Sequence, residues 1–255
     1  MSRDIQKFCA ECVSCQSCAS TTPHERAPLQ WIHAERPFQR ISADITELPV
    51  TSLGNRYVLV VMDYFTHFVN LYPLKDQRAT TVAQCIFEDY IRQHGVPEII
   101  HTDQGRQFES DLIKHLCSQL GIEKTHTSSY HAQCDGMVER LNRTLKDQLA
   151  KYICESGGEW DRYLPQVELA YNSSVHSSTG FSPFFLAHGR EPRLPAEILL
   201  NCSPAVTSCT PGTPADYACD VTTRLSYVFK DAAVRSTAAK LQKRQYDKKD
   251  VFPPT

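Results

Sequence analysis

Residues 38–74 read FQRISADITELPVTSLGNRYVLVVMDYFTHFVNLYPL, and this stretch decides the fold class. It contains three strand-like runs, FQRISADI, RYVLVVMDYF and HFVNLYPL, which are rich in β-branched and aromatic residues. Gly54 and Asn55 mark a turn between the first two runs, and Thr66 and His67 mark a tighter bend before the third. The stretch therefore predicts three adjoining strands.

The chain after this stretch changes from strand periodicity to helical periodicity. Apolar residues recur at helical spacing over residues 80–95, and Gly95 and Pro97 are typical of a helix end. The short run IIHTD, residues 99–103, then predicts a fourth strand that leads into the turn residues Gln104 and Gly105.

Further helices and one more strand follow. Residues 110–121 predict a helix that begins at Ser110, a residue that caps helices well. Its apolar face is expected to consist of Leu112, Ile113, Leu116 and Leu120. Residues 122–128 predict a fifth strand, and residues 159–176 predict a helix kinked at Pro165. This order predicts an α/β fold with a five-stranded mixed sheet flanked by helices.

Three acids, Asp44, Asp103 and Glu139, lie in different local contexts. Asp44 and Asp103 are predicted at strand ends, whereas Glu139 lies in a helix 36 positions after Asp103. A two-metal phosphoryl-transfer site uses two cations about 4 Å apart to activate the attacking oxygen and stabilise the leaving one. Mg²⁺ prefers oxygen ligands, so a few carboxylates can hold both ions. Taken singly, each acid is an ordinary surface carboxylate; together the three predict such a site.

The helix that contains Glu139 is amphipathic. Its apolar stripe consists of Val138, Leu141, Leu145, Leu149 and Ile153. Arg143 and Lys146 share the face of Glu139. A solvated, salt-bridging face is the common outcome for such residues, but their position beside the third acid favours contact with phosphate.

Four segments carry a family resemblance: GNRYVLVVMDYFTHFVNLYPL, HGVPEIIHTDQGRQFES, SSYHAQCDGMVERLNRTLK and AYNSSVHSSTGFSPFFLAHGREP. In this order and spacing the chain resembles the integrase catalytic core of retroviruses and, more closely, of gypsy-class long-terminal-repeat retrotransposons. The resemblance covers residues 36–195 and implies a ribonuclease-H-like fold. This is also the fold indicated by the order of the predicted elements.

The resemblance implies roles for individual residues. Asp44, Asp103 and Glu139 would bind two Mg²⁺ or Mn²⁺ ions, with Asp44 bridging both. The residues expected to lie beside the site and to contact DNA are Tyr130, His131, Gln133, Asn142 and Lys146, and Arg143 joins them from the same helix face. The implied reaction is endonucleolytic 3′-end processing followed by strand transfer into target DNA. DNA and other copies of the chain are the implied partners.

Asp63 is a further acid at the end of a predicted strand. It follows the apolar run YVLVVM, and in another nuclease of this fold it would serve as an accessory metal ligand. Because the resemblance places the catalytic acids elsewhere, we expect Asp63 to support folding.

The N-terminal region, residues 1–30, has a run of cysteines. Cys12 and Cys15 resemble the Cys-x-x-Cys half of the zinc module that precedes integrase cores, but no histidine occurs before His24. A tetrahedral zinc site needs four ligands. We favour a remnant of this module; Cys9 and Cys18 as substitute zinc ligands, or an iron–sulfur cluster, are the alternatives.

The C-terminal region has a Pro/Ser/Thr-rich segment, residues 196–219, which predicts a linker, and then a helical, basic tail, residues 220–255. Within residues 220–250, eight basic and four acidic residues give a net charge of +4, although the whole chain is −2 with a pI of about 6.5. A basic helix suits contact with the DNA backbone. A solvated helix or a partner-binding arm is the more frequent outcome.

Composition indicates the cellular setting. Eleven scattered cysteines argue against a disulfide framework, and no apolar run approaches the roughly 20 residues of a membrane span. No signal-peptide pattern follows Met1. We expect an intracellular protein, nuclear or cytoplasmic and not secreted.

Two functional classes stay open, with a third that is weaker. The intact acids favour a metal-dependent DNA integrase. The incomplete zinc half and the near-neutral charge favour a domesticated or truncated module that binds nucleic acid or protein without turnover. A ribonuclease-H-type hydrolase of RNA:DNA hybrids is the third class, which the helical position of Glu139 disfavours.

Overall fold

The chain divides into two compact units, Met1–Gln30 and Trp31–Thr255. The computed structural model describes the backbone of residues 7, 8, 12, 34–126, 158–194 and 214–251 and, within the last range, the side chains of 221–239 and 241. Lys7, Phe8 and Cys12 are therefore the described residues of the first unit, and the fold described below is that of the second.

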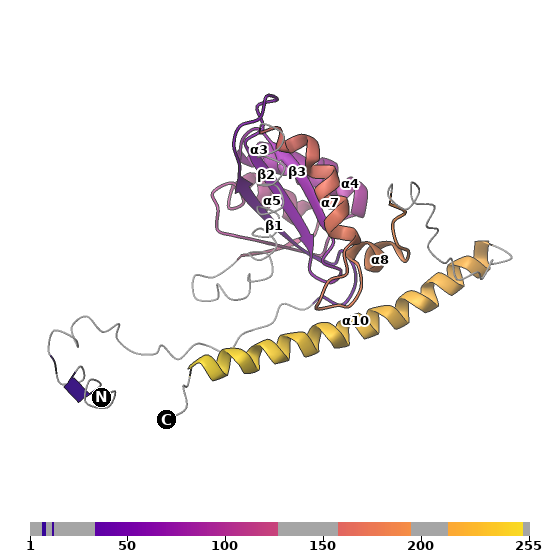
Figure 1. Cartoon of the computed structure of the whole chain (residues 1–255). Helices are drawn as coiled ribbons and strands as arrows, with labels where there is room; N and C mark the ends of the chain where they lie inside the picture. Colours follow the sequence, from indigo (N-terminus) through magenta and orange to yellow (C-terminus); the bar gives the residue numbers. More distant parts are fainter. Residues whose placement is uncertain (1–6, 9–11, 13–33, 127–157, 195–213, 252–255) are drawn as a thin grey trace. The chain divides into compact units, whose positions relative to one another are not determined.

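A five-stranded mixed sheet forms the centre of the second unit (Figure 1). Its strands are β1 Arg40–Glu47, β2 Tyr57–Asp63, β3 Val69–Leu74, β4 Ile99–Thr102 and β5 Glu123–His126. Their order across the sheet is β3-β2-β1-β4-β5. The pairs β1–β2 and β2–β3 are antiparallel, whereas β1–β4 and β4–β5 are parallel. This confirms the predicted α/β fold class.

Among the described residues the predicted helices occur in the predicted order. The helices are α3 Ala79–Gln84, the π-helical η1 Cys85–Tyr90, α4 Ile91–His94, α5 Asp111–Gln119, the 3₁₀-helical η3 Trp160–Tyr163, α7 Leu164–Ser173, α8 Pro183–His188 and α10 Pro214–Val251. The helix predicted over 80–95 is thus one contiguous run with a π-helical middle, and it ends at Gly95 with φ of 82°. The start of α10 lies inside the segment 196–219 that we predicted as a linker. Helix α8 is a further helix that we did not predict.

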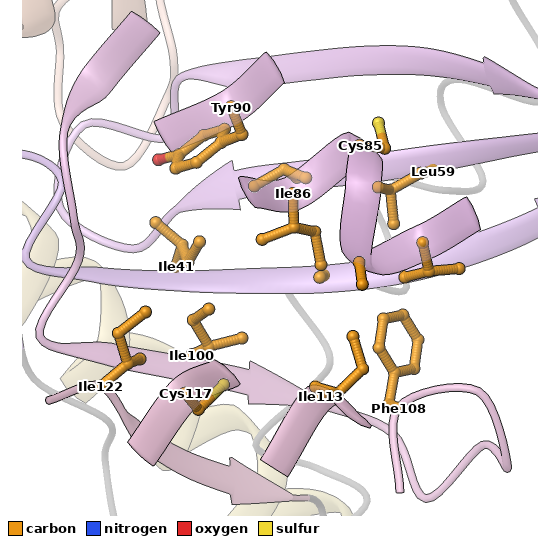
Figure 2. Packing of buried hydrophobic residues seen from close by; sticks show 14 of the residues in the cluster. Ile41, Leu59, Cys85, Ile86, Tyr90, Ile100, Phe108, Ile113, Cys117 and Ile122 are labelled. Atoms are coloured by element: carbon orange, nitrogen blue, oxygen red, sulfur yellow. The ribbon is translucent and has the colours of Figure 1, made fainter. Parts of the chain in front are cut away.

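Helices cover both faces of the sheet because β2 is apolar on both of its faces. Leu59 and Val61 pack into a first core with side chains from α3, η1 and α5. Figure 2 shows Ile41 and Ile100 of the sheet in this core, together with Ile86 of η1. The alternate residues of β2 pack into a second core with η3 and α7. A strand buried on both faces reads as a continuous apolar run, as YVLVVM does.

Two details of the predicted helices were wrong. Leu112 and Leu120 are 40% and 42% exposed, and the buried face of α5 is centred on Ile113 and Cys117 instead. Pro165 does not kink a long helix, because it lies in the first turn of α7, after the separate 3₁₀ turn η3. Proline is tolerated in a first helical turn, since the N–H it lacks has no partner within the helix there.

Helix α7 covers the outer edge of β3 with two polar side chains. Asn172 accepts a hydrogen bond from the N–H of Val69 at 2.9 Å and donates to the carbonyl of the same residue at 2.8 Å. One helical turn earlier, Glu168 Oε2 accepts from the N–H of Leu71 at 2.9 Å. An edge strand otherwise offers these groups to other chains, so α7 closes this edge.

Helix α10 contacts the rest of the second unit along one stripe. The ring of Phe229 lies edge-on to Phe65 with centroids 5.3 Å apart, and Ala232 is 2% exposed. The guanidinium of Arg235 lies over the ring of Phe181 at 5.6 Å and pairs with Asp231. Among the helices described, α10 included, none combines the length and apolar character that crossing a membrane requires.

Candidate active site

Asp44 and Asp103 are neighbours across two adjacent parallel strands. The last residue pair between β1 and β4 is Ala43 with Thr102. Asp44 and Asp103 are the residues that directly follow this pair. Adjacent strands lie about 4.8 Å apart. We predicted both acids at strand ends, and this was wrong for Asp44, which is the fifth of eight residues in β1. Because β4 stops at Thr102 while β1 continues to Glu47, Asp44 lies just beyond the last residue pair between these two strands.

The pleat of the sheet gives both acids the same side. Ile41 and Ala43 pack into the first core, so Asp44 faces the opposite side, where its partner on β2, Val60, belongs to the second core. The same alternation, continued one step beyond β4, turns Asp103 to this side as well. Asp44 is half-buried and Asp103 is exposed, so the pair borders solvent.

Backbone N–H groups hold one oxygen of each carboxylate. Asp44 Oδ1 accepts from the N–H of Ile45 at 2.8 Å, and Asp103 Oδ1 accepts from the N–H of Gly105 at 2.9 Å. The carbonyl of Gly105 in turn accepts from the N–H of Phe108 and of Glu109, at 2.9 and 3.0 Å. Phe108 is fully buried, which anchors the turn after Asp103 in the first core.

A row of polar residues, two of them buried and one half-buried, precedes the two acids on the same face. Ser42, His101 and Thr125 are aligned across β1, β4 and β5 by the strand register. The imidazole Nδ1 of His101 lies 2.9 Å from the hydroxyl of Thr125. We did not predict this row from the sequence. A signal was available, because Ser42 lies two positions before Asp44 and His101 two positions before Asp103, on the same face of each strand; Thr125 is placed by its pairing with His101.

Asp63 lies on the opposite face from Asp44 and Asp103. It pairs with Ile41, whose side chain packs into the first core, and it is 1% exposed. Its Oδ2 accepts from the N–H and the hydroxyl of Thr66, at 2.8 and 2.7 Å. Burial raises the pKa of Asp63 to about 6, and the bonds from Thr66 oppose this shift. The geometry supports the expectation that Asp63 is structural.

The remaining predicted site residues lie outside the described residues. These are Glu139, Tyr130, His131, Gln133, Asn142, Arg143, Lys146 and Cys15. Cys12, the other cysteine of the predicted zinc remnant, is described and half-buried. Within the part of the chain that the structure describes, no three His, Cys, Asp or Glu side chains gather in a way that would hold a metal ion.

The carboxylate groups of Asp44 and Asp103 are suitable ligands for a divalent cation. Both residues present carboxylate oxygens at the solvent border of one sheet face, and carboxylate oxygen is the ligand type that Mg²⁺ and Mn²⁺ prefer. Asp44 and Asp103 supply two of the three predicted ligands. The third, Glu139, stays a prediction.

The chain is similar to known proteins in both sequence and structure. Residues 34–132 match the family model described as "Integrase core domain". The chain is 34% identical over 193 residues to the Gag-Pol polyprotein of Koala retrovirus, which covers 74% of this chain and 11% of that protein. It is 31% identical over 162 residues to the Pol polyprotein from transposon 412 of Drosophila melanogaster, covering 63% and 13%. The chain thus spans a small part of these relatives.

Solved structures share the fold. A chain of the simian T-cell lymphotropic virus intasome in complex with the PP2A regulatory subunit B56 gamma matches with a TM-score of 0.58 and 23% identity, covering 76% of this chain and 69% of that one. The HTLV-2 integrase catalytic core domain in complex with magnesium, in its trimeric form, matches with a TM-score of 0.50 and 22% identity, covering 60% and 98%. The ribonuclease-H-like fold is therefore confirmed, and the relation to gypsy-class elements in particular stays a prediction.

Proposed function

We propose that this chain is a metal-dependent polynucleotidyl transferase that processes DNA 3′ ends and joins them to target DNA. The observation that carries the proposal is the pair Asp44 and Asp103, adjacent on one sheet face at the border with solvent, with one oxygen of each carboxylate fixed by the backbone. The match of residues 34–132 to the integrase core family model supports the same reaction class.

Asp44, Asp103 and Glu139 would hold the ions. When bound, the ions would act as Lewis acids toward the scissile phosphate and lower the pKa of the attacking hydroxyl or water. The protein's own part is positional. The Gly105 N–H fixes the Asp103 carboxylate, and the β1–β4 register sets its distance from Asp44. Because these groups are placed before substrate arrives, little reorganisation is needed at the reaction step.

DNA contacts are proposed for residues near the site and for oligomers of the chain. Tyr130, His131, Gln133, Asn142, Arg143 and Lys146 are the candidate DNA-binding residues. The similar solved structures include an intasome and a trimeric form of an integrase core, which supports assembly with other copies.

The test is a strand-transfer assay, together with its reverse on a branched DNA, in Mg²⁺ and in Mn²⁺. We expect activity in the intact chain and a loss of at least about 100-fold in Asp103→Asn, since removing a metal-ligand charge abolishes much of the ion's transition-state stabilisation. Asp111→Asn is the matched control, because Asp111 is an exposed acid in the first turn of α5. An intact chain that binds DNA without any metal-dependent turnover would favour the binding module instead.

A further inference from the structure

Gly105 separates the Asp103 carboxylate from the side chain of Gln107. A Cβ placed on Gly105 would lie 2.4 Å from Gln107 Nε2, 2.8 Å from Gln107 Cδ and 2.9 Å from Asp103 Oδ1. Non-bonded atoms do not approach a Cβ this closely. The amide of Gln107 therefore occupies the space that a side chain at position 105 would fill, and Asp103 Oδ1 borders the same space.

The backbone holds Gln107 in this place from its C-terminal side. Its carbonyl accepts a hydrogen bond from the hydroxyl of Ser110 at 3.1 Å, and the same hydroxyl caps α5 by accepting from the N–H of Ile113. Phe108, the next residue, is fully buried in the first core. Gln107 itself is half-buried, and its amide lies over Gly105.

We propose that Gln107 is a positioning residue that acts through Asp103. Its amide, packed over Gly105, restricts rotation of the Asp103 carboxylate and keeps it in the orientation that binds a divalent cation. This inference rests on the proposed function. Groups that pack against or hydrogen-bond a ligating carboxylate set its direction and thereby the affinity for the ion. A neutral amide suits this place because it adds no charge that would compete with the cation or repel Asp103.

The test measures Mn²⁺ affinity directly, from the electron paramagnetic resonance signal of the free ion, using the full chain without DNA. Gln107→Met keeps the length of the side chain and removes the amide. We expect its Kd for Mn²⁺ to rise about 10-fold, as is typical when a residue that orients a ligand is lost. Gln93→Met is the matched control, because Gln93 is an exposed glutamine on α4, and its Kd should not change.

A double-mutant cycle separates positioning from loss of structure. Gly105→Ala places a methyl group where the Gln107 amide lies, so it should raise the Kd at least as much as Gln107→Met does. The two changes together should then be no worse than Gly105→Ala alone, because the amide is already displaced. Thermal unfolding without metal should be the same in Gln107→Met as in the unchanged chain.

Three results would overturn the inference. Wild-type Mn²⁺ affinity in Gln107→Met, while Asp103→Asn loses the ion, would reject the role of Gln107 and leave the proposed function standing. A fall in metal-free thermal stability parallel to the loss of affinity would make Gln107 merely structural. If Asp103→Asn binds Mn²⁺ as well as the unchanged chain does, the proposed function and this inference fail together.

Discussion

Asp44 and Asp63 lie on neighbouring strands, yet the pleat turns them to opposite faces of the sheet and so gives them different roles. Asp44 borders solvent beside Asp103, whereas Asp63 is 1% exposed in the first core. Burial disfavours the charged form of Asp63 and raises its pKa to about 6. In this buried place the Asp63 carboxylate stabilises the backbone, because it accepts a hydrogen bond from the N–H of Thr66 in the bend between β2 and β3.

Asp63→Ala should therefore lower stability and keep Mn²⁺ affinity, whereas Asp103→Ala should keep stability and lose Mn²⁺ affinity. Asp63→Ala leaves the N–H and hydroxyl of Thr66 without their acceptor, and we expect it to lower the free energy of unfolding by about 1–3 kcal/mol. Its Mn²⁺ affinity per folded molecule should not change. Asp103→Ala should lose the ion and change stability by less than about 1 kcal/mol, because Asp103 is exposed. Denaturant unfolding and Mn²⁺ titration of both variants measure this, and a weakened metal site in Asp63→Ala would contradict it.

At the candidate active site, the sequence singles out residues but does not give their surroundings. Asp44 was singled out because it follows an alternating strand pattern and Asp103 because it ends a short apolar run; their roles stay predictions. That Asp44 lies within its strand depends on how far β1 pairs with β2, a pairing that continues to Glu47 and Tyr57 and that local patterns around Asp44 do not encode. The row of Ser42, His101 and Thr125 needs the register of three strands that are distant in sequence. The place of the Gln107 amide depends on the missing side chain of Gly105.

At the scale of elements, strands and helices were predicted well where burial is simple. β2 reads as one apolar run because both of its faces are covered. The face of α5 was misplaced because leucine was taken as buried at positions 112 and 120, whereas the helix turns Cys117 inward. Pro165 was read as a kink because the 3₁₀ turn before α7 has no distinct sequence signal.

The contact of α7 with the edge of β3 should depend on pH. Burial raises the pKa of Glu168 from 4.5 to about 7, so the folded chain holds this proton more tightly than the unfolded chain does. Glu168 therefore favours folding most at low pH, and this contribution is lost as pH rises from about 4.5 to about 7. The full shift corresponds to a change on the order of 3 kcal/mol.

Glu168→Gln should remove this dependence, since an amide oxygen still accepts from the N–H of Leu71 and does not ionise. We compare the free energy of unfolding of the variant with that of the unchanged chain. The difference should rise in favour of the variant by about 3 kcal/mol between pH 4.5 and pH 8. Urea unfolding at both pH values measures the difference. Glu159→Gln is the control, because Glu159 accepts hydrogen bonds from Ser52, in the loop between β1 and β2, and not from β3. Parallel pH profiles for the unchanged chain and Glu168→Gln would reject the assignment.

At the scale of the whole molecule, charge is distributed unevenly along the chain. The segment 220–250 carries +4 while the complete chain carries −2, so the remaining residues carry −6. On α10, Arg224 and Lys230 are exposed, and Arg235 is engaged by Asp231 and the ring of Phe181. A polyanion would therefore meet its most favourable potential along this helix and not over the acidic remainder.

If α10 contacts DNA phosphates, its charges should set the salt dependence of binding. Each phosphate contact contributes a slope of about −0.9 to the plot of log affinity against log salt concentration, so replacing both Arg224 and Lys230 by Gln should make the slope shallower by nearly 2. Lys75→Gln with Arg78→Gln removes two exposed positive charges near the start of α3 and is the matched control. Duplex binding by fluorescence anisotropy over a range of salt concentrations gives both slopes. Equal slopes for the two double variants would mean that α10 does not touch the DNA backbone and that its charge serves solvation or another partner.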